Sequence, residues 1–260
     1  MKQRYTTIVL GATYYGLGYA SSHEGCLILE EAQTLGGDFH HCLRPVRMEE
    51  AGEAERNSEM GRIMAEYGVW TETSFDLLKA QAVVHEYAAR KIAAGMEILL
   101  DARILSVNRE EAGVTVTFIT NQGIQSVCAD NLVDTSVDCV SAPGKVVCTA
   151  KSFNVFTVAM GEDFSKKLKT VCPACCVRNG PLENEKLIQF CVEPEATLTE
   201  TYEKMMAYWA LAFPEGEEKI LFAADAFDVR YEPTGESPAG WVAERFPNPV
   251  TAFVKGAMAQ

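Results

Sequence analysis

The sequence predicts an α/β fold in which a parallel sheet carries a β-hairpin and is followed by a smaller lobe of mixed α+β structure. Residues 5–10 and 26–30 are short, mainly apolar runs, which is typical of strands buried on both faces of a parallel sheet. Residues 14–22 are expected to form a short helix between them, so the chain opens in β-α-β order. The stretch VTVTFIT-NQG-IQSVCA, around residues 114–129, has the alternation and the turn residues of a β-hairpin.

The remaining elements follow from apolar spacing and capping residues. Helical spacing predicts helices over 53–67 and 76–93, after a loop over 31–50. Apolar runs predict strands over 97–100, 103–107, 131–138, 151–160, 186–192 and 219–231, the last as one long strand or a strand pair. Two more helices are expected, over 197–213 with a Thr197 or Thr199 cap and over 249–259 with Asn248 and Pro249 as N-cap and first residue.

Composition excludes several classes of protein. The chain has 260 residues, of which 48% are apolar and 23% charged, as in an ordinary globular protein. A net charge of −13 leaves no basic stripe for phosphates, so we expect no nucleic-acid partner. No apolar run is long enough to span a bilayer and no signal-peptide pattern is present, so a cytoplasmic protein is expected. Its nine cysteines are therefore read as thiols.

The stretch TIVLGATYYG has the outline of a dinucleotide-binding turn. Gly11 and Gly16 occupy the first and third glycine positions of G-x-G-x-x-G, and Thr13 stands at the middle position. A side chain there crowds a pyrophosphate, although a threonine hydroxyl could also donate a hydrogen bond to it. Taken alone, this motif is equally compatible with a purely structural strand-to-helix turn.

A second motif follows at the end of the next predicted strand, in the words E-E-A-Q-T-L-G-G. Glu30 ends that strand, where an acidic residue can bind ribose hydroxyls, and Gly36-Gly37 come six residues later. Together the two motifs resemble the FAD-dependent oxidoreductases of the glutathione-reductase-like superfamily. The distance from Gly11 to Glu30 is about four residues shorter than is usual there, which is about one helical turn and keeps the helix facing the same way.

The resemblance extends to four later stretches: AAGMEILLDARILSV, NLVDTSVD, ILFAAD and NPVTAFVKGAMAQ. Ser136 replaces a glycine in the second and Ala224 a glycine in the third. In the family the last stretch is a closing helix whose N-terminus faces the flavin and stabilises its negative charge. The resemblance thus implies FAD as cofactor, held by Gly11, Ala12, Thr13, Tyr15, Gly16, Glu30, Glu31, Gly36, Gly37, Arg103, Ile104, Thr135, Asp225, Asn248, Pro249 and Val250.

It also implies a division of the chain. A Rossmann-like FAD-binding domain with a β-hairpin insertion would comprise residues 1–40, 96–144 and 219–260. A small α+β substrate or cap lobe would comprise residues 41–95 and 145–218, and within it 145–215 carry no motif whose chemistry can be read.

Candidate catalytic residues follow Gly36-Gly37 in the words DFHHCLRPVR. In the resembling family this segment passes the flavin ring, so His40, His41, Cys42 and Arg44 are the candidates. A histidine there could act as a base, polarise the flavin or carry a covalent link, and is equally consistent with loop hydrogen bonding. Arg44 or Arg47 could bind an anionic substrate, although an exposed arginine is the commoner outcome.

The cysteine-rich stretch Cys172-Pro-Ala-Cys175-Cys176 has three readings. It could be a redox pair at a helix start, part of a metal or cluster site, or a set of packed thiols, and the last is favoured. No second spaced pair supports a zinc site, so no metal is expected.

These patterns favour a flavin-dependent oxidoreductase that transfers a hydride between a small organic substrate and FAD. The chain is shorter than is usual in that family, so a second hypothesis is a subunit or cofactor-free scaffold whose site is completed by a partner. An NAD(P)-dependent reductase is a weaker alternative, because no second dinucleotide turn is found. A homo-oligomer or a partner subunit is expected.

Overall fold

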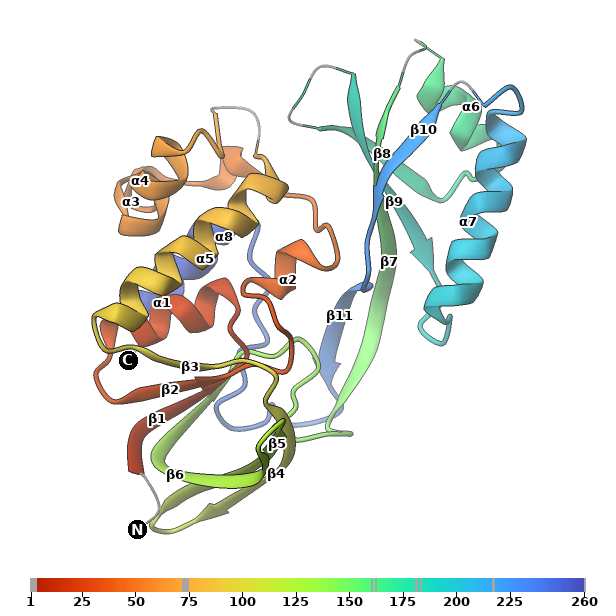
Figure 1. Ribbon diagram of the computed structural model, residues 1–260. Coiled ribbons are helices and arrows are strands. Elements are labelled where there is room, and N and C mark those ends of the chain that lie inside the picture. Colours follow the sequence, from red (N-terminus) through yellow and green to blue (C-terminus); the bar gives the residue numbers. More distant parts are fainter. Residues whose placement is uncertain are drawn as a thin grey trace.

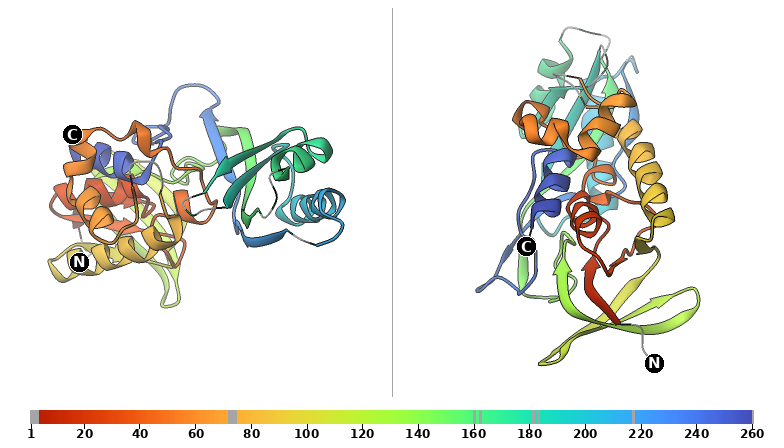
Figure 2. Two further views of the ribbon diagram at one scale, coloured as in Figure 1. Left: turned by 90° about the horizontal axis from the view of Figure 1, so that it is seen from above. Right: turned by 90° about the vertical axis from the view of Figure 1, so that its left-hand side faces the viewer.

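The computed structural model describes residues 4–71, 75–159, 161, 163–180, 182, 184–216 and 218–259. The chain folds as an α/β protein with two sheets, as the sequence predicts at this level. One sheet is mixed and lies beneath a group of helices, and the other is antiparallel and stands beside it (Figure 1). A view from above shows the two lobes lying side by side (Figure 2).

The first sheet has the strand order β3-β2-β1-β6-β5-β4, with β3, β2, β1 and β6 parallel. Its strands are β1 (Arg4–Leu10), β2 (Cys26–Leu29), β3 (Glu97–Leu99), β4 (Arg103–Glu110), β5 (Gly113–Thr120) and β6 (Gly123–Asp134). The β5–β6 hairpin turns where the NQG stretch predicts it, at Thr120–Gly123, and Gly123 supplies a φ of +99°. The β4–β5–β6 segment curves beneath the parallel strands, so Val116 and Phe118 share a small core with Ile8 and Leu29.

One prediction about this sheet is wrong. The sequence predicts a hairpin strand that ends near residue 129 and a separate buried strand over 131–138, but β6 runs without a break to Asp134. Its first half pairs antiparallel with β5, and Cys128 to Asp134 pair parallel with β1. A single strand satisfies both neighbours, because the sheet curves along it.

The helices of the first lobe are α1 (Tyr14–Ser22), α2 (Gly37–His40), α3 (Glu53–Asn57), α4 (Glu59–Glu66), α5 (Leu77–Ala93) and α8 (Pro249–Met258), with a 3₁₀ turn, η1, at Met48–Glu50. The predicted loop over 31–50 therefore contains two short helical elements. The predicted helix over 53–67 is broken at Ser58, which caps α4 by accepting the N–H of Gly61 at 3.0 Å.

Helices α1 and α8 approach each other more closely than side chains ordinarily permit. A Cβ placed on Gly18 would lie 2.0 Å from the carbonyl oxygen of Phe253, and one on Gly256 would lie 2.0 Å from that of Tyr15. Each helix thus uses a glycine to admit the other's backbone. Asn248 caps α8 by accepting the N–H of Thr251 at 2.7 Å, as its sequence predicts.

The second sheet is built around the long strand β7 (Val146–Val158). The other strands are β8 (Cys175–Asn179), β9 (Glu185–Val192), β10 (Lys219–Ala223) and β11 (Asp228–Pro233). Strand β9 covers one edge of β7, and β10 and β11 share the other, so the predicted long strand is a strand pair. The outer face is covered by α6 (Phe164–Val171) and α7 (Leu198–Ala212), as Figure 1 shows.

Several segments pair or pack with elements on the other side of the predicted division of the chain. Strands β10 and β11, from the predicted range 219–260, pair with β7, because β7 is long enough to hold both. Helices α3 and α4 come from the stretch placed with the second lobe, yet they pack near α8. Helix α6 and strand β8 were not expected at all. The two-domain division itself stays a prediction.

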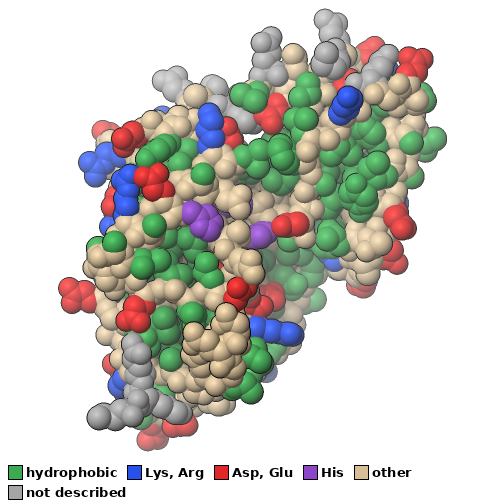
Figure 3. All heavy atoms as spheres, viewed as in Figure 1, with side chains coloured by type: hydrophobic (Ala, Val, Ile, Leu, Met, Phe, Trp, Pro, Cys, Tyr) green, Lys and Arg blue, Asp and Glu red, His purple; other side chains and the backbone are tan. Residues whose placement is uncertain are grey.

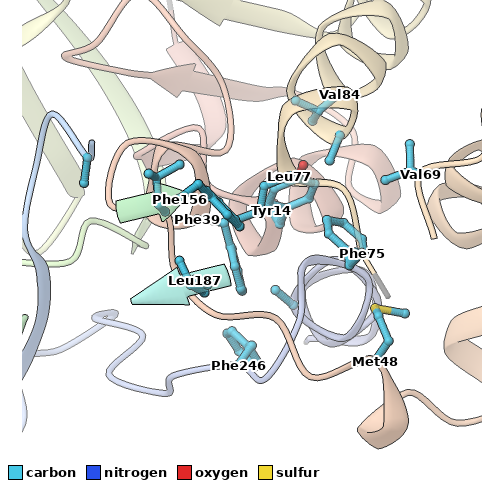
Figure 4. Packing of buried hydrophobic residues seen from close by; sticks show 14 of the residues in the cluster. Tyr14, Phe39, Met48, Val69, Phe75, Leu77, Val84, Phe156, Leu187 and Phe246 are labelled. Carbon is cyan, nitrogen blue, oxygen red and sulfur yellow. The ribbon is translucent and has the colours of Figure 1, made fainter. Parts of the chain in front are cut away.

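A single apolar core joins the two lobes. Phe156 of β7 and Leu187 of β9 belong to the same buried cluster as Tyr14 and Phe39 of the first lobe. Figure 4 shows these side chains converging between α2 and the second sheet. Burying apolar surface stabilises a protein by about 25 cal/mol per Å², so this shared cluster stabilises the contact between the two lobes.

Candidate functional site

The carboxyl edge of the first sheet brings three distant segments together. Leu10 of β1 pairs with Leu29 of β2 and with Asp134 of β6, so the residues that follow each strand lie side by side. These are Gly11, Glu30 and Thr135. Gly11 has a φ of +91°, and a Cβ there would lie 2.9 Å from the hydroxyl of Thr135. Glycine is therefore required at the first position of the turn.

Glu30 organises the turn through its carboxylate. Its Oε2 accepts the N–H of Ala12 at 2.6 Å, and its Oε1 accepts the N–H of Ala32 at 2.8 Å. Burial raises the pKa of Glu30, although both N–H donors act in the opposite direction. The neighbouring Glu31 accepts the N–H of Ile104 at 3.1 Å, which ties the third predicted segment to the same edge.

Thr13, at the middle position of the motif, has a structural duty. It is the N-cap of α1 and accepts the N–H of Gly16 at 3.1 Å. Its hydroxyl donates to that of Thr135 at 2.8 Å, and Thr135 lies 2.9 Å from the carbonyl oxygens of Leu10 and Gly11. Thr13 therefore uses its proton inside the protein and does not keep it for a ligand.

Three cavities follow one another from this edge toward the start of α8. The first, here called the edge cavity, has a volume of about 340 Å³ and is lined by Gly11, Glu30, Gly37, His41 and Ile104 among others. A narrow cavity of about 60 Å³ adjoins it and shares Thr13, Asp38 and Arg44 with it. The third has about 660 Å³ and five arginine side chains in its wall, and we call it the arginine chamber. Arg44 lines all three.

The four predicted catalytic residues are placed differently. His40 lines none of the three cavities; it is buried against Tyr14, whose hydroxyl lies 2.8 Å from its Nε2, and burial lowers its pKa to about 3. Cys42 reaches the edge cavity, but burial raises its pKa to about 12, so its thiol stays protonated at neutral pH. His41 and Arg44 remain the two with suitable positions.

His41 lies in the wall of the edge cavity and is held from two sides. Its Nδ1 lies 2.9 Å from a carboxylate oxygen of Asp225, and its Nε2 contacts the hydroxyl of Thr34. The backbone carbonyl of His41 also accepts the N–H of Asp225 at 3.1 Å. Asp225, predicted from the ILFAAD motif, is thus brought to His41 and fixes its ring. Histidine side chains are visible on this face where the two lobes meet (Figure 3).

Asp38 is a site residue that the sequence analysis missed. The residue is half-buried and lines both the edge cavity and the narrow cavity, and its buried Oδ1 has no hydrogen-bond partner in the described part of the chain. Burial raises its pKa to about 6, against the opposing charge of Arg44 and the N–H of Tyr14. The signal was its place directly after Gly36-Gly37, at the turn into α2.

A second missed residue, Asp228, holds two arginines. Its carboxylate pairs with Arg44, Nε to Oδ1 3.0 Å, and with Arg245 through the other oxygen. The Asp228 side chain is only 1% exposed and that of Arg44 9%. Of this ion triplet, Arg44 lines all three cavities and Arg245 lines the narrow cavity and the arginine chamber. No sequence motif surrounds Asp228. Its role is recognised only from the structure, where its side chain on β11 is buried.

The remaining predicted residues divide into two groups. Tyr15 lines the narrow cavity and stacks on Phe246, with ring centroids 5.5 Å apart. Gly36 shapes the turn, since its Cβ would meet Tyr14 at 2.7 Å. Those that line none of the three cavities are Ala12, Gly16, Gly36, Arg103, Asp225, Asn248, Pro249 and Val250.

The cysteine-rich stretch follows the end of α6 and leads into β8, so it does not begin a helix. The helix dipole therefore gives no help to a thiolate there. Burial raises the pKa of Cys175 to about 12, with Cys172 acting in the same direction. Among the described residues, no group of three or more His, Cys, Asp or Glu could hold a metal ion. None of the described helices combines the length and apolar character needed to cross a membrane.

No protein-family model and no curated protein sequence matches the chain. Solved structures do match in fold. The chain superposes on p-nitrophenol 4-monooxygenase of Pseudomonas putida DLL-E4 with a TM-score of 0.60 and 10% identity, covering 98% of this chain and 76% of that one. A flavoprotein/dehydrogenase of Cytophaga hutchinsonii superposes with a TM-score of 0.60 and 12% sequence identity, covering 98% of this chain and 76% of that one.

A third match is aklavinone-11 hydroxylase, whose structure is a ternary complex with FAD and aklavinone. It gives a TM-score of 0.50 and 16% identity, covering 93% of this chain and 56% of that one. The chain therefore shares the fold of these flavoproteins, and it spans between about half and three quarters of their length.

Proposed function

We propose that this chain is a FAD-dependent oxidoreductase acting on a small organic molecule. The observation that carries the proposal is the convergence of Gly11, Glu30 and Gly37 in the wall of one cavity, at the carboxyl edge of a parallel sheet. Ligands of open α/β sheets bind at that edge. The likeness in fold to FAD-dependent hydroxylases and monooxygenases supports FAD as the cofactor. The two motifs also favour a relation to the glutathione-reductase-like flavoproteins.

The residues present fit the adenosine end of such a cofactor. Glu30 presents a carboxylate beside the edge cavity, where ribose hydroxyls can donate to it. Glu31 and Ile104 close the wall next to it. The N-terminus of α1 offers the positive end of the helix dipole to a phosphate, while two of its N–H groups are taken within the chain, that of Gly16 by Thr13 and that of Tyr14 by Asp38.

The middle of the cofactor meets a mixed environment. Arg44 offers guanidinium donors to a diphosphate, whereas the Asp38 carboxyl beside it would repel one when ionised. When bound, FAD would supply a ring that accepts or donates a hydride. His41, oriented by Asp225 at Nδ1, could hold or transfer a proton at Nε2, where the Thr34 hydroxyl now lies, and Asp38, with a pKa raised to about 6, can exchange one near neutral pH.

The test is a visible absorbance spectrum of the purified chain, repeated on the supernatant after acid precipitation. A flavin spectrum that moves to the supernatant is expected for non-covalent FAD. Flavin retained in the pellet would instead indicate a covalent link, with His41 as the histidine that lines the cavity. A colourless chain that cannot be reconstituted with FAD would refute the proposal.

A second candidate is a subunit whose site is completed by a partner. The observation that favours it is the narrow cavity of about 60 Å³, where Asp38 and the Arg44 ion triplet restrict the path between the two larger cavities. Activity that appears only when another chain is added would distinguish this candidate from the first.

A further inference from the structure

The arginine chamber is the most concentrated group of cationic side chains around any of the cavities described. Its arginines come from four separate parts of the chain: the segment after α2, strand β8, strand β11 and the segment before α8. They are Arg44, Arg47, Arg178, Arg230 and Arg245. Glu244 is the one acidic residue among the chamber's described lining residues. This concentration stands in a chain whose net charge is −13.

The acidic partners of these arginines do not neutralise them fully. Asp228 is a single carboxylate shared by Arg44 and Arg245, and Asp38 beside Arg44 adds a second negative charge only when it is ionised, with a pKa raised to about 6. Arg47 pairs with Glu50 and Arg230 pairs with Glu232, but both pairs are largely solvent-exposed and hence weak. Arg178 forms no ion pair with any residue in the described ranges.

Arg44 also has unused hydrogen-bond donors. It is 7% exposed and bonds Asp228 through Nε, while its two terminal amino groups have no partner within the described chain. These amino groups are not among the fully buried polar atoms that lack a partner, and Arg44 lines all three cavities, so its donors are open to a ligand or to water there. Burial and the charge of Arg44 together lower the pKa of Arg245, which means that the two cations repel each other. A bound anion would accept the free donors of Arg44 and reduce this repulsion.

We propose that the arginine chamber binds the carboxylate or phosphate group of an anionic small molecule. Guanidinium groups recognise both groups through paired, charge-assisted hydrogen bonds. The chamber adjoins the narrow cavity through Arg44 and Phe246, so a molecule anchored there extends toward the edge cavity. That this molecule is the substrate rests on the proposed function; that the chamber binds it does not.

The test is titration calorimetry of the purified chain at low salt, without added FAD, using benzoate and inorganic phosphate as the two anionic probes. Benzamide, which has the shape of benzoate without its charge, is the matched neutral probe. We expect at least one anion to bind and benzamide to fail, and the affinity to fall as salt screens the arginines. Benzoate alone would assign a carboxylate, and phosphate alone would assign a phosphate group.

Two variants locate the site. Arg178→Gln removes a chamber cation that has no ion-pair partner among the described residues, and should weaken binding about tenfold, the effect of losing one charge-assisted bond. Arg62→Gln on α4 removes an exposed charge outside the chamber and should leave affinity unchanged. Arg230→Gln is a second chamber variant, and a thermal melt of each protein identifies any that fail to fold.

Equal binding of benzoate and benzamide, no binding of either anion at millimolar concentration, or equal effects of Arg178→Gln and Arg62→Gln would overturn the proposal. Repeating the titration with saturating FAD separates it from the proposed function. Displacement of the anion by FAD would make the chamber part of the cofactor site and would also overturn it. Anion binding by a chain that takes up no flavin would support the anion site in the chamber and refute the proposed oxidoreductase function.

Discussion

The carboxyl edge of the first sheet and the arginine chamber are built by different means. At the edge, the site is built around main-chain groups. Gly11 takes a positive φ, the Glu30 carboxylate accepts two main-chain N–H groups, and the Thr135 hydroxyl lies against two main-chain carbonyls. In the chamber, the site is built by converging side chains, which come from segments about 200 residues apart in sequence, from Arg44 to Arg245. A site made by the backbone leaves a local pattern in the sequence, whereas a site made by converging side chains leaves none.

Asp228→Asn should produce the largest effect, on the chamber side of this comparison. The change keeps the volume but leaves Arg44 and Arg245 without their shared charge. Removing one partner of a buried ion pair should cost about 4 kcal/mol of the free energy of unfolding. Urea denaturation measures it. Glu232→Gln, which breaks the exposed pair with Arg230, is the control and should change little; equal losses would mean that the triplet is not a buried electrostatic unit.

Gly18→Ala tests the backbone-built lobe. The new Cβ would lie 2.0 Å from the carbonyl oxygen of Phe253, so α1 and α8 must separate. We expect a loss of about 3 kcal/mol in unfolding free energy, measured by thermal or urea denaturation. Gly235→Ala adds the same methyl group where nothing lies within 4 Å and should be nearly neutral. A neutral Gly18→Ala would show that this close approach is not required.

Asp38→Asn should stabilise the protein in a pH-dependent way. Asp38 has a raised pKa of about 6, so the folded state holds its proton more tightly than the unfolded chain. Ionising Asp38 therefore lowers the free energy of unfolding. This loss is absent below about pH 4, grows between about pH 4 and 6, and reaches about 2 to 3 kcal/mol at higher pH. The free energy of unfolding of the variant should therefore be higher than that of the wild type at pH 7 and equal to it near pH 4, as measured by urea denaturation. A difference independent of pH would contradict this assignment.

The same substitution sharpens the cofactor question. Because ionised Asp38 lies beside Arg44 in the narrow cavity, Asp38→Asn should also tighten FAD binding at neutral pH, and wild-type affinity should rise as the pH falls toward 5. Flavin fluorescence titration at several pH values measures both.

Glu30→Gln should have the smallest of these effects. The amide can still accept the N–H of Ala12 or of Ala32, but not both, and it presents no charge to ribose hydroxyls. We expect FAD affinity to fall about tenfold in a fluorescence titration. Glu24→Gln, an exposed change just before β2, is the control and should leave affinity unchanged. Equal affinity in the Glu30 variant would place the ribose elsewhere.

Much of the fold was predictable because its strands, caps and turns are local features. The β-α-β start, the NQG hairpin, and the Asn248-Pro249 start of α8 lie where their residues predict them. The sequence does not show which sheet β10 and β11 join, because their pairing is decided by β7, far away in the sequence.

For the site, the strand-end residues Gly11 and Glu30 were predictable, but the fate of the segment after Gly36-Gly37 was not. Sequence alone treats His40 and His41 alike. In the structure α2 turns His40 inward to Tyr14 and His41 outward to the edge cavity, because the two lie about 100° apart around a helical axis. Asp38 and Asp228 were missed because their roles come from tertiary contacts: Asp38 reaches the cavity walls, and Asp228 pairs with two arginines distant in sequence.

The packing of α1 against α8 has a consequence for synthesis of the chain. The first helix is complete at Ser22, but the backbone it rests on ends at Met258. At 5 to 20 residues per second, α1 must wait roughly 12 to 50 seconds for its partner to be made. The backbone of α1 at Tyr15 and Gly18 lacks its neighbour until Phe253 and Gly256 have been added, so the two helices can pack together only late in synthesis.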